Sequence, residues 1–485
     1  MKHIAIYFMG RLLTGSIGLV SIYILTRILS PEEYGNFALL IAIVTFISGV
    51  SYQWLVISTS RLINEYKTKL PTFLRAVIIL FVFSTVIVSI LMVMANYIYP
   101  KITENLYWIL VVITISLGGY NLLSHLANIA QKPFIYSALA FIRAISSLFV
   151  SIAFIRYLDL SAEGAVLGFG IGFILAILVF FAYFNTYISS INLNLYSKSL
   201  FIDTKLIITL YRYGIPLSLT YLSIMIINLS DRLMLGKMSN MVEVASYSAA
   251  YDLSQQTVGV IMNIFFLAYF PKILNAYSNK KNDEVFNKMR QLSTILLGMG
   301  TLVSILFFIT SSGIATIMFG SGLAHDTIEI MPLIVLGVVV GSYKGFYIDI
   351  VFQLTKRTDI QLKITLLMAF SNILLNIFLI PSFGSKGAAI STLISFLLGS
   401  MVSWIYAKRE LYVSLPIDDI IKIIISGLVV LIISTLIGFN LTTVFQTLMV
   451  LVILSFSYII FIFTLNVMDV QTLLLSYYKK QANDL

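Results

Sequence analysis

Long apolar runs alternate along this chain with short polar breaks, and each run is long enough to cross a lipid bilayer. A spanning helix needs roughly 20 mostly apolar residues. Lipid offers the backbone no hydrogen-bond partners, so each run is predicted to be a helix rather than a strand or loop. The pattern predicts an all-α membrane protein of fourteen spans: 4–28, 35–58, 76–98, 107–130, 134–155, 164–188, 213–236, 244–270, 291–311, 329–352, 361–380, 387–407, 418–439 and 445–465.

Positive charge is concentrated in alternate breaks between these runs. With the N-terminus inside, the inner segments carry twenty-two of the 31 Lys and Arg residues, whereas the outer segments carry five. The positive-inside rule therefore predicts that both termini are cytoplasmic, which agrees with an even number of spans. No break is long enough for a soluble domain, so we expect the protein to act within or across the bilayer.

An internal repeat relates two halves of the chain. Gly118-Gly-Tyr120 matches Gly341-Ser-Tyr343, and Glu163-Gly-Ala165 matches Lys386-Gly-Ala388, both at an offset of 223 residues. A constant offset with the same span pattern between the matches indicates that spans 1 to 6 repeat as spans 7 to 12. The predicted domains are an N-terminal six-helix bundle, a C-terminal six-helix bundle, and two added helices with a tail: 1–205, 206–410 and 411–485.

An even number of helices in each half means that both halves enter the membrane in the same sense. Parallel repeats of this kind occur in secondary transporters, where substrate binds between the halves and the halves rock around it. The repeat therefore predicts transport by alternating access.

Composition excludes several other classes of protein. The chain is 59% hydrophobic and only 11% charged, with a mean hydropathy of +0.98, whereas about a quarter of the residues of a soluble domain are charged. It has no cysteine, and its three histidines are far apart in sequence, so we expect no disulfide, thiol chemistry or metal site. No nucleotide-binding or hydrolase motif is present, so we expect neither an enzyme nor a cofactor.

Charged residues within the predicted spans are candidates for a polar lumen, because charges at this depth are expensive and usually face protein or water. Arg143 lies near the middle of its span, where snorkelling to either surface is difficult, so a lumen role is favoured over an ion pair. Lys344 lies at a similar depth, and its counterpart in the repeat is Asn121. Arg11 could line the lumen or anchor the inner surface, and Asp349 is expected at the membrane interface.

The stretch from Tyr213 to Phe270 carries a second group of charges. Asp231 and Arg232 lie near the outer end of their span, and because neighbours on a helix point about 100° apart they are not expected to pair with each other. Asp252 on the next span is a candidate partner for Arg232, as lumen residues or as a structural clasp between helices. Gly214 and Pro216 predict a bend in the first of these spans.

Three stretches together resemble bacterial polysaccharide flippases of the Wzx type, in the multidrug/oligosaccharidyl-lipid/polysaccharide exporter superfamily. They are Tyr23-Ile-Leu-Thr-Arg-Ile-Leu-Ser30-Pro-Glu-Glu-Tyr-Gly35-Asn-Phe-Ala; Asp231-Arg-Leu-Met-Leu-Gly236 with Tyr247-Ser-Ala-Ala-Tyr251; and Asn376-Ile-Phe-Leu-Ile-Pro381-Ser-Phe-Gly384-Ser-Lys-Gly387-Ala-Ala. The resemblance covers the whole chain and implies two six-helix bundles with two extra helices. It also implies a cationic lumen, a pattern that Arg143 and Lys344 fit by their depth.

The function implied by this resemblance is to move undecaprenyl-pyrophosphate-linked oligosaccharide units from the inner to the outer leaflet of the cytoplasmic (inner) membrane, for O-antigen or other surface polysaccharides. Membrane lipids are expected partners, together with a polysaccharide polymerase and a chain-length regulator; nucleic acid is not. The alternatives are an ion-coupled multidrug exporter, for which midplane carboxylates are expected, and a peptidoglycan-precursor flippase. A membrane glycosyltransferase is disfavoured because no large outer loop with catalytic acids is present.

Overall fold

The computed structural model describes residues 2–63, 65–66, 69–98, 107–130, 132–191, 204–411, 415–437 and 443–469. This part of the chain is helical and contains no strand. It divides into two compact units, Met1–Ser248 and Ala249–Leu485.

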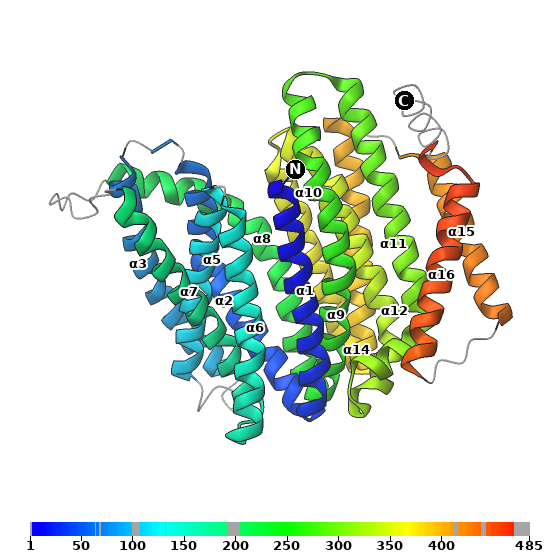
Figure 1. Ribbon diagram of the computed structural model, residues 1–485, viewed down its shortest axis with the longest axis horizontal. Coiled ribbons are helices and arrows are strands. Elements are labelled where there is room, and N and C mark those ends of the chain that lie inside the picture. Colours follow the sequence, from blue (N-terminus) through cyan, green and yellow to red (C-terminus); the bar gives the residue numbers. More distant parts are fainter. Residues whose placement is uncertain are drawn as a thin grey trace. The chain divides into compact units, whose positions relative to one another are not determined.

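The first unit is an assembly of membrane-length helices and the start of α9 (Figure 1). Its helices are α1 (Lys2–Ile28), α2 (Pro31–Leu62), α3 (Leu70–Ile98), α5 (Tyr107–Ile129), α6 (Pro133–Tyr157), α7 (Ala162–Ile191), α8 (Thr204–Met238) and α9 (Met241–Ser254).

In the second unit, two spans are interrupted by a turn of π-helix, and the last two helices, α15 and α16, lie beside α11 (Figure 1). Its elements are η2 (Gln255–Gly259), α10 (Val260–Ser278), α11 (Asn282–Met318), α12 (Ser321–Tyr343), η3 (Lys344–Ile348), α13 (Ile350–Leu354), α14 (Thr358–Glu410), α15 (Ile417–Ile437), α16 (Val444–Thr464) and the 3₁₀ turn η4 (Val467–Asp469).

Most of these helices are long and apolar enough to cross a membrane. Twelve in the described residues meet this description, and α8 makes a thirteenth if its two segments form one span. Those segments, Thr204–Ile215 and Ser218–Met238, meet at an angle of 47°, which confirms the predicted bend. The protein is therefore a multi-pass membrane protein.

The 53-residue α14 reverses direction at Gly384. The backbone there has φ 52° and ψ −133°, a combination that side-chain-bearing residues rarely adopt. The Asn372 amide donates to Thr392 Oγ1 at 3.2 Å, although a straight helix would separate the two residues by about 30 Å. The chain therefore folds back on itself, and the two halves correspond to the predicted spans 361–380 and 387–407.

The tight connection between α1 and α2 follows from local sequence. Ser30 Oγ accepts from the Glu33 amide at 3.3 Å, and Glu33 Oε2 accepts from the Ser30 amide at 2.8 Å, with Pro31 opening the helix. This reciprocal capping satisfies two amides that a helix start leaves without partners. Beside it, Gly35 packs so closely on the backbone of Met241 that a β-carbon would collide with the Met241 carbonyl.

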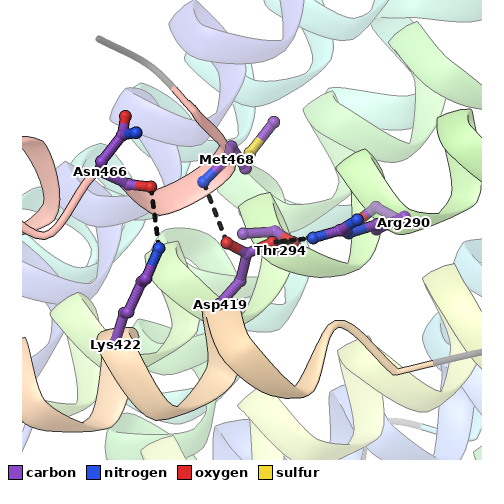
Figure 2. A network of polar contacts seen from close by, with 6 residues as sticks. All are labelled: Arg290, Thr294, Asp419, Lys422, Asn466 and Met468. Atoms are coloured by element: carbon purple, nitrogen blue, oxygen red, sulfur yellow. Dashed lines mark hydrogen bonds and ion pairs between the residues drawn. The ribbon is translucent and has the colours of Figure 1, made fainter. Parts of the chain in front are cut away.

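A buried carboxylate anchors the start of α15 to α11 (Figure 2). Asp419 is 4% exposed and accepts from Arg290 at 3.4 Å, Thr294 at 3.3 Å and the Met468 backbone amide at 3.1 Å. These donors come from α11 and from the turn that follows α16. One side chain therefore connects both added helices to the rest of the second unit.

Further contacts hold α15 and α16 against the same helix. The Tyr458 hydroxyl on α16 donates to the Gly298 carbonyl on α11 at 3.0 Å, and Lys422 on α15 donates to the Asn466 carbonyl at 3.2 Å. An apolar cluster lies between the three helices: Leu302, Ile305, Val430, Val450, Leu454 and Tyr458. Together these contacts pack the added pair of helices on α11 and on each other.

Candidate functional site

Small residues bring α6 and α7 into close contact around Arg143. On α6, Ser147 and Ser151 follow Arg143 at intervals of four residues, and therefore lie on the same face of the helix. They pack on Gly168 and Gly172 of α7, where an added β-carbon would collide with the Ser151 and Ser147 side chains. Ser147 Oγ and Ser151 Oγ also donate to α7 carbonyls, at 3.3 Å and 3.2 Å. Such contacts between small residues are a common basis of helix association in membranes.

This packing places the Arg143 side chain between aromatic rings. Its guanidinium carbon lies 5.4 Å from the centroid of Phe173 on α7 and 5.9 Å from that of Tyr120 on α5. The two rings contact each other edge to face at 5.2 Å. Arg143 is half-buried, and the described part of the chain contains no carboxylate that pairs with it.

An arginine held by aromatic rings keeps its full positive charge. The ring quadrupole attracts a cation by about 0.5 to 2 kcal/mol but does not neutralise it. A guanidinium also presents a planar set of donors that matches phosphate and carboxylate oxygens. Arg143 is therefore available for an anionic group that enters this part of the first unit.

The second candidate cation, Lys344, has a different environment. It is 3% exposed, and its ammonium lies 2.7 Å from Asp349 Oδ2. Asp349 is also 3% exposed and accepts from Gln361 at 3.3 Å and from Ser403 at 3.1 Å. Asp349 is therefore the buried counter-charge of Lys344, and its position at the level of the membrane interface stays a prediction. The role of Lys344 in substrate binding stays a prediction.

A turn of π-helix explains how two residues five apart can pair. On a regular α-helix such residues point about 140° apart. Here the segment η3 begins at Lys344, and the wider turn brings the side chain of Asp349 to the same face. Turns of this kind are rare and are often found at functional positions.

The candidate residues Asp231 and Arg232 both contact α9 from α8, within the first unit. Asp231 is 1% exposed and accepts from the Tyr247 hydroxyl at 2.5 Å. Arg232 is half-buried and donates from Nε to Ser248 Oγ at 2.9 Å. Both side chains therefore find partners on the following helix, as expected for neighbours that diverge by about 100°. The role of Asp231 and Arg232 in a lumen stays a prediction.

The other candidate site residues, Arg11, Asn121 and Asp252, lie on three different helices. Arg11 on α1 is half-buried, next to Gly10, whose backbone packs directly on Ser137 of α6. Asn121 follows Tyr120 on α5 and is half-buried. Asp252 is half-buried on the part of α9 that belongs to the second unit, so its pairing with Arg232 stays a prediction.

A family model described as "Polysaccharide biosynthesis protein" matches residues 1–277, more than half of the chain. This chain belongs to that family. Its relative in Haloferax volcanii, the probable flippase AglR, is 27% identical over 179 residues, a match that covers 36% of each chain. The chain thus matches about a third of the length of this curated relative. The resemblance indicated by the sequence motifs is confirmed.

Solved structures of transporters have a similar fold. The lipid II flippase MurJ in an inward closed conformation matches with a TM-score of 0.74 at 16% identity, over 94% of this chain and 97% of that chain. An inward-facing multidrug resistance MATE family transporter of the MOP superfamily matches with a TM-score of 0.67 at 14% identity, over 82% and 94%. At these identities the similarity establishes the fold alone.

Several residues that contact Arg143 or Asp349 were not predicted from the sequence. Tyr120 and Phe173 hold Arg143, yet Tyr120 attracted attention only through the repeated Gly-Gly-Tyr motif. Gln361 and Ser403 complete the environment of Asp349, and they come from the two arms of α14, 42 residues apart in sequence. A polar residue inside an otherwise apolar span is the one available signal for such partners.

Proposed function

We propose that this protein is a flippase that moves undecaprenyl-pyrophosphate-linked oligosaccharide repeat units from the inner to the outer leaflet by alternating access, for assembly of cell-surface polysaccharide. The observation that carries the proposal is Arg143, a half-buried cation in a membrane-spanning helix, held by aromatic rings. Placing an arginine at this depth is costly, and such residues commonly mark substrate pathways. An uncompensated cation suits an anionic substrate.

In this mechanism the protein shields the polar head of the substrate while the lipid tail stays in the bilayer. Pyrophosphate and acidic sugars are repelled by hydrocarbon, and a charge-assisted hydrogen bond from Arg143 lowers that barrier. Arg11 and Asn121, also half-buried in the first unit, extend the polar surface. Lys344 contributes only when its ion pair with Asp349 opens. No bond in the substrate is broken or made, so the protein is not an enzyme.

The proposed topology has fourteen spans with both termini in the cytoplasm. Two observations support this count: the bent α8 can form one span, and the two arms of α14 each have the length of a span on either side of Gly384. The charge asymmetry of the breaks supports the orientation. The location that follows is the cytoplasmic membrane, the inner membrane of a two-membrane cell.

The proposed domains follow the repeat, with bundles 1–205 and 206–410 and the added segment 411–485. The anchoring of α15 and α16 to α11 through Asp419 supports a distinct, attached pair of helices. Helix α8 begins the second half of the repeat but lies within the first compact unit, where Gly214 packs on the Trp54 carbonyl of α2. The proposed boundary and the compact units therefore differ by the length of α8 and part of α9.

The test is export of surface polysaccharide by cells in which this chain, or a variant, is the only flippase. Arg143→Ala should reduce export roughly ten- to hundred-fold at unchanged protein abundance, because charge-assisted hydrogen bonds contribute about 1.5 to 3 kcal/mol. Arg143→Lys should retain part of the activity. The matched control is Arg156→Ala, an exposed arginine at the end of the same helix, which should export normally. Normal export from Arg143→Ala would overturn the assignment.

The choice of cargo needs a second experiment, since flippases for peptidoglycan precursors and ion-coupled multidrug exporters share this fold. Purified protein in liposomes should move a fluorescent lipid-linked oligosaccharide, and movement should be lost in Arg143→Ala. Movement of a peptidoglycan precursor instead, or drug resistance conferred on a sensitive strain, would favour an alternative. We further propose that a polysaccharide polymerase and a chain-length regulator receive the product, which co-purification would test.

A further inference from the structure

The middle of the first unit holds three buried hydroxyl groups that the surrounding protein leaves without partners. They belong to Ser48 and Tyr52 on α2 and to Ser84 on α3, whose side chains are 3%, 1% and 0% exposed. Among the described residues, none of these three oxygens has a hydrogen-bond partner. Ser51 and Thr59 on α2 also lack a partner among the described residues, at other positions along or around the helix. By contrast, Ser60 on α2 donates to the Val56 carbonyl at 2.8 Å, and Ser89 on α3 donates to the Thr85 carbonyl at 3.1 Å.

Two ring pairs show how α2 and α3 are aligned. Near the connection between the helices, Tyr66 stacks on Phe73 with centroids 5.5 Å apart. Farther along, Tyr52 stacks on Phe81 with centroids 4.6 Å apart and an interplanar angle of 23°. Residue numbers fall along α2 as they rise along α3, so the two helices are antiparallel and Tyr52 lies level with Phe81.

This alignment places the three residues at neighbouring levels of α2 and α3. Ser48 is one turn before Tyr52 on α2, and Ser84 is about one turn after Phe81 on α3, so both serines lie on the same side of the stacked rings. Side chains on a helix lean towards its N-terminus, which directs the Tyr52 hydroxyl towards the level of Ser48. The Tyr52 ring also fills the space above Gly118 on α5, where a β-carbon would collide with it, and cannot swing away in that direction.

Hydroxyls at this depth need a partner more than hydroxyls near a surface do. The hydrocarbon layer supplies no water, and an unpaired polar group there is strongly disfavoured. A buried water typically makes about three hydrogen bonds to such groups. A cation at the same place would need negative charge to compensate for its lost hydration, and these three oxygens are neutral.

We propose that Ser48, Tyr52 and Ser84 together bind one internal water molecule, which bridges α2 and α3 in the middle of the first unit. The bound water satisfies all three hydroxyls and joins the two helices where apolar packing alone would leave them unpaired. The proposal does not depend on the proposed transport function.

Removing the Tyr52 hydroxyl should destabilise the protein if that hydroxyl binds a water molecule, and should not destabilise it if the hydroxyl has no partner. In the purified full-length protein, Tyr52→Phe should lower the apparent Tm by about 2 to 4 °C, the change expected for losing one buried hydrogen bond. Tyr458→Phe is the calibrating variant, because the Tyr458 hydroxyl donates to the Gly298 carbonyl at 3.0 Å. A Tm for Tyr52→Phe equal to or above that of the unmodified protein would overturn the proposal.

A shared ligand also predicts non-additive effects. Ser84→Ala should lower Tm in the unmodified protein but have a smaller effect in the Tyr52→Phe background, where the water is already lost. Fully additive losses would show that the two hydroxyls do not share a ligand. Replacing sodium chloride by choline chloride should leave the Tm unchanged. A sodium-dependent rise that disappears in Tyr52→Phe would overturn the choice of water in favour of a cation.

Discussion

Lys344 and Asp349 form a buried ion pair at 2.7 Å across a turn of π-helix, with both side chains 4% exposed. Arg143 in the first unit is instead held between aromatic rings. The two intramembrane basic residues therefore differ: the charge of Lys344 is balanced by a carboxylate, whereas Arg143 has only uncharged rings beside it among the contacts described. Of these two residues, one is compensated by its own protein and the other is available to a ligand. The proposed function therefore depends on Arg143 first.

Removing only one charge of this ion pair should destabilise the protein more than removing both charges. Lys344→Met leaves a buried carboxylate without its cation, and such changes cost about 3 to 5 kcal/mol. The double variant Lys344→Met with Asp349→Asn should recover most of that loss. Thermal unfolding of the three proteins measures the coupling. Equal stability of Lys344→Met and the unmodified protein would contradict a structural role for the pair.

The contact between α6 and α7 should not tolerate a larger residue at its centre. Gly172→Ala places a β-carbon against the Ser147 side chain and the Arg143 carbonyl, so we expect a loss of about 1 to 3 kcal/mol and a displaced Arg143. Gly119→Ala is the matched control, because its β-carbon would meet side chains only at 3.5 Å and 3.6 Å. Thermal unfolding and export assays on both variants check this. Equal behaviour of the two variants would show that α6 and α7 can separate freely.

The reversal of α14 should require glycine. Gly384→Ala forces a β-carbon into a backbone conformation that is nearly confined to glycine, at a cost of about 1 to 3 kcal/mol. Gly345→Ala serves as control, since its β-carbon would meet nothing within 4 Å. We expect a lower Tm for the first variant and a small change for the second. An unchanged Gly384→Ala protein would argue against the reversal at this residue.

The anchor of the added helices can be tested with neighbouring aspartates. Asp419→Asn weakens hydrogen bonds from Arg290, Thr294 and Met468, and should lower stability by about 1 to 3 kcal/mol. Asp418→Asn changes the same charge at an exposed position and should have little effect. Urea unfolding of the purified protein compares the two. A larger loss for Asp418→Asn would show that the anchor lies elsewhere.

Much of this architecture is predictable from the sequence because the bilayer imposes strong rules on every segment. Apolar length located the helices, and Gly214 with Pro216 predicted the bend in α8 that the structure contains. The start of α2 is also encoded locally, because Ser30 and Glu33 cap it reciprocally. The count of fourteen spans and the side of each terminus stay predictions.

The environments of the charged side chains were harder to predict. The sequence predicted a similar depth for Arg143 and Lys344, and sequence spacing indicated no partner for either. Asp349 is five residues from Lys344, and a regular α-helix would point these two side chains in different directions. Their pairing could not be predicted because the π-turn that brings them together was not predicted. Likewise, Tyr120 and Phe173 converge on Arg143 from separate helices.

By itself, the sequence determined that this chain is a multi-pass helical membrane protein, because hydrocarbon thickness and backbone hydrogen bonding leave few ways to place apolar segments. Its motifs, by resemblance, indicated the polysaccharide biosynthesis family that the family model confirms. Only the tertiary structure decided which buried charge is compensated and which is held by rings. Those outcomes depend on contacts between helices distant in the chain and on a local change of helical pitch, neither of which leaves a periodic signal in the sequence.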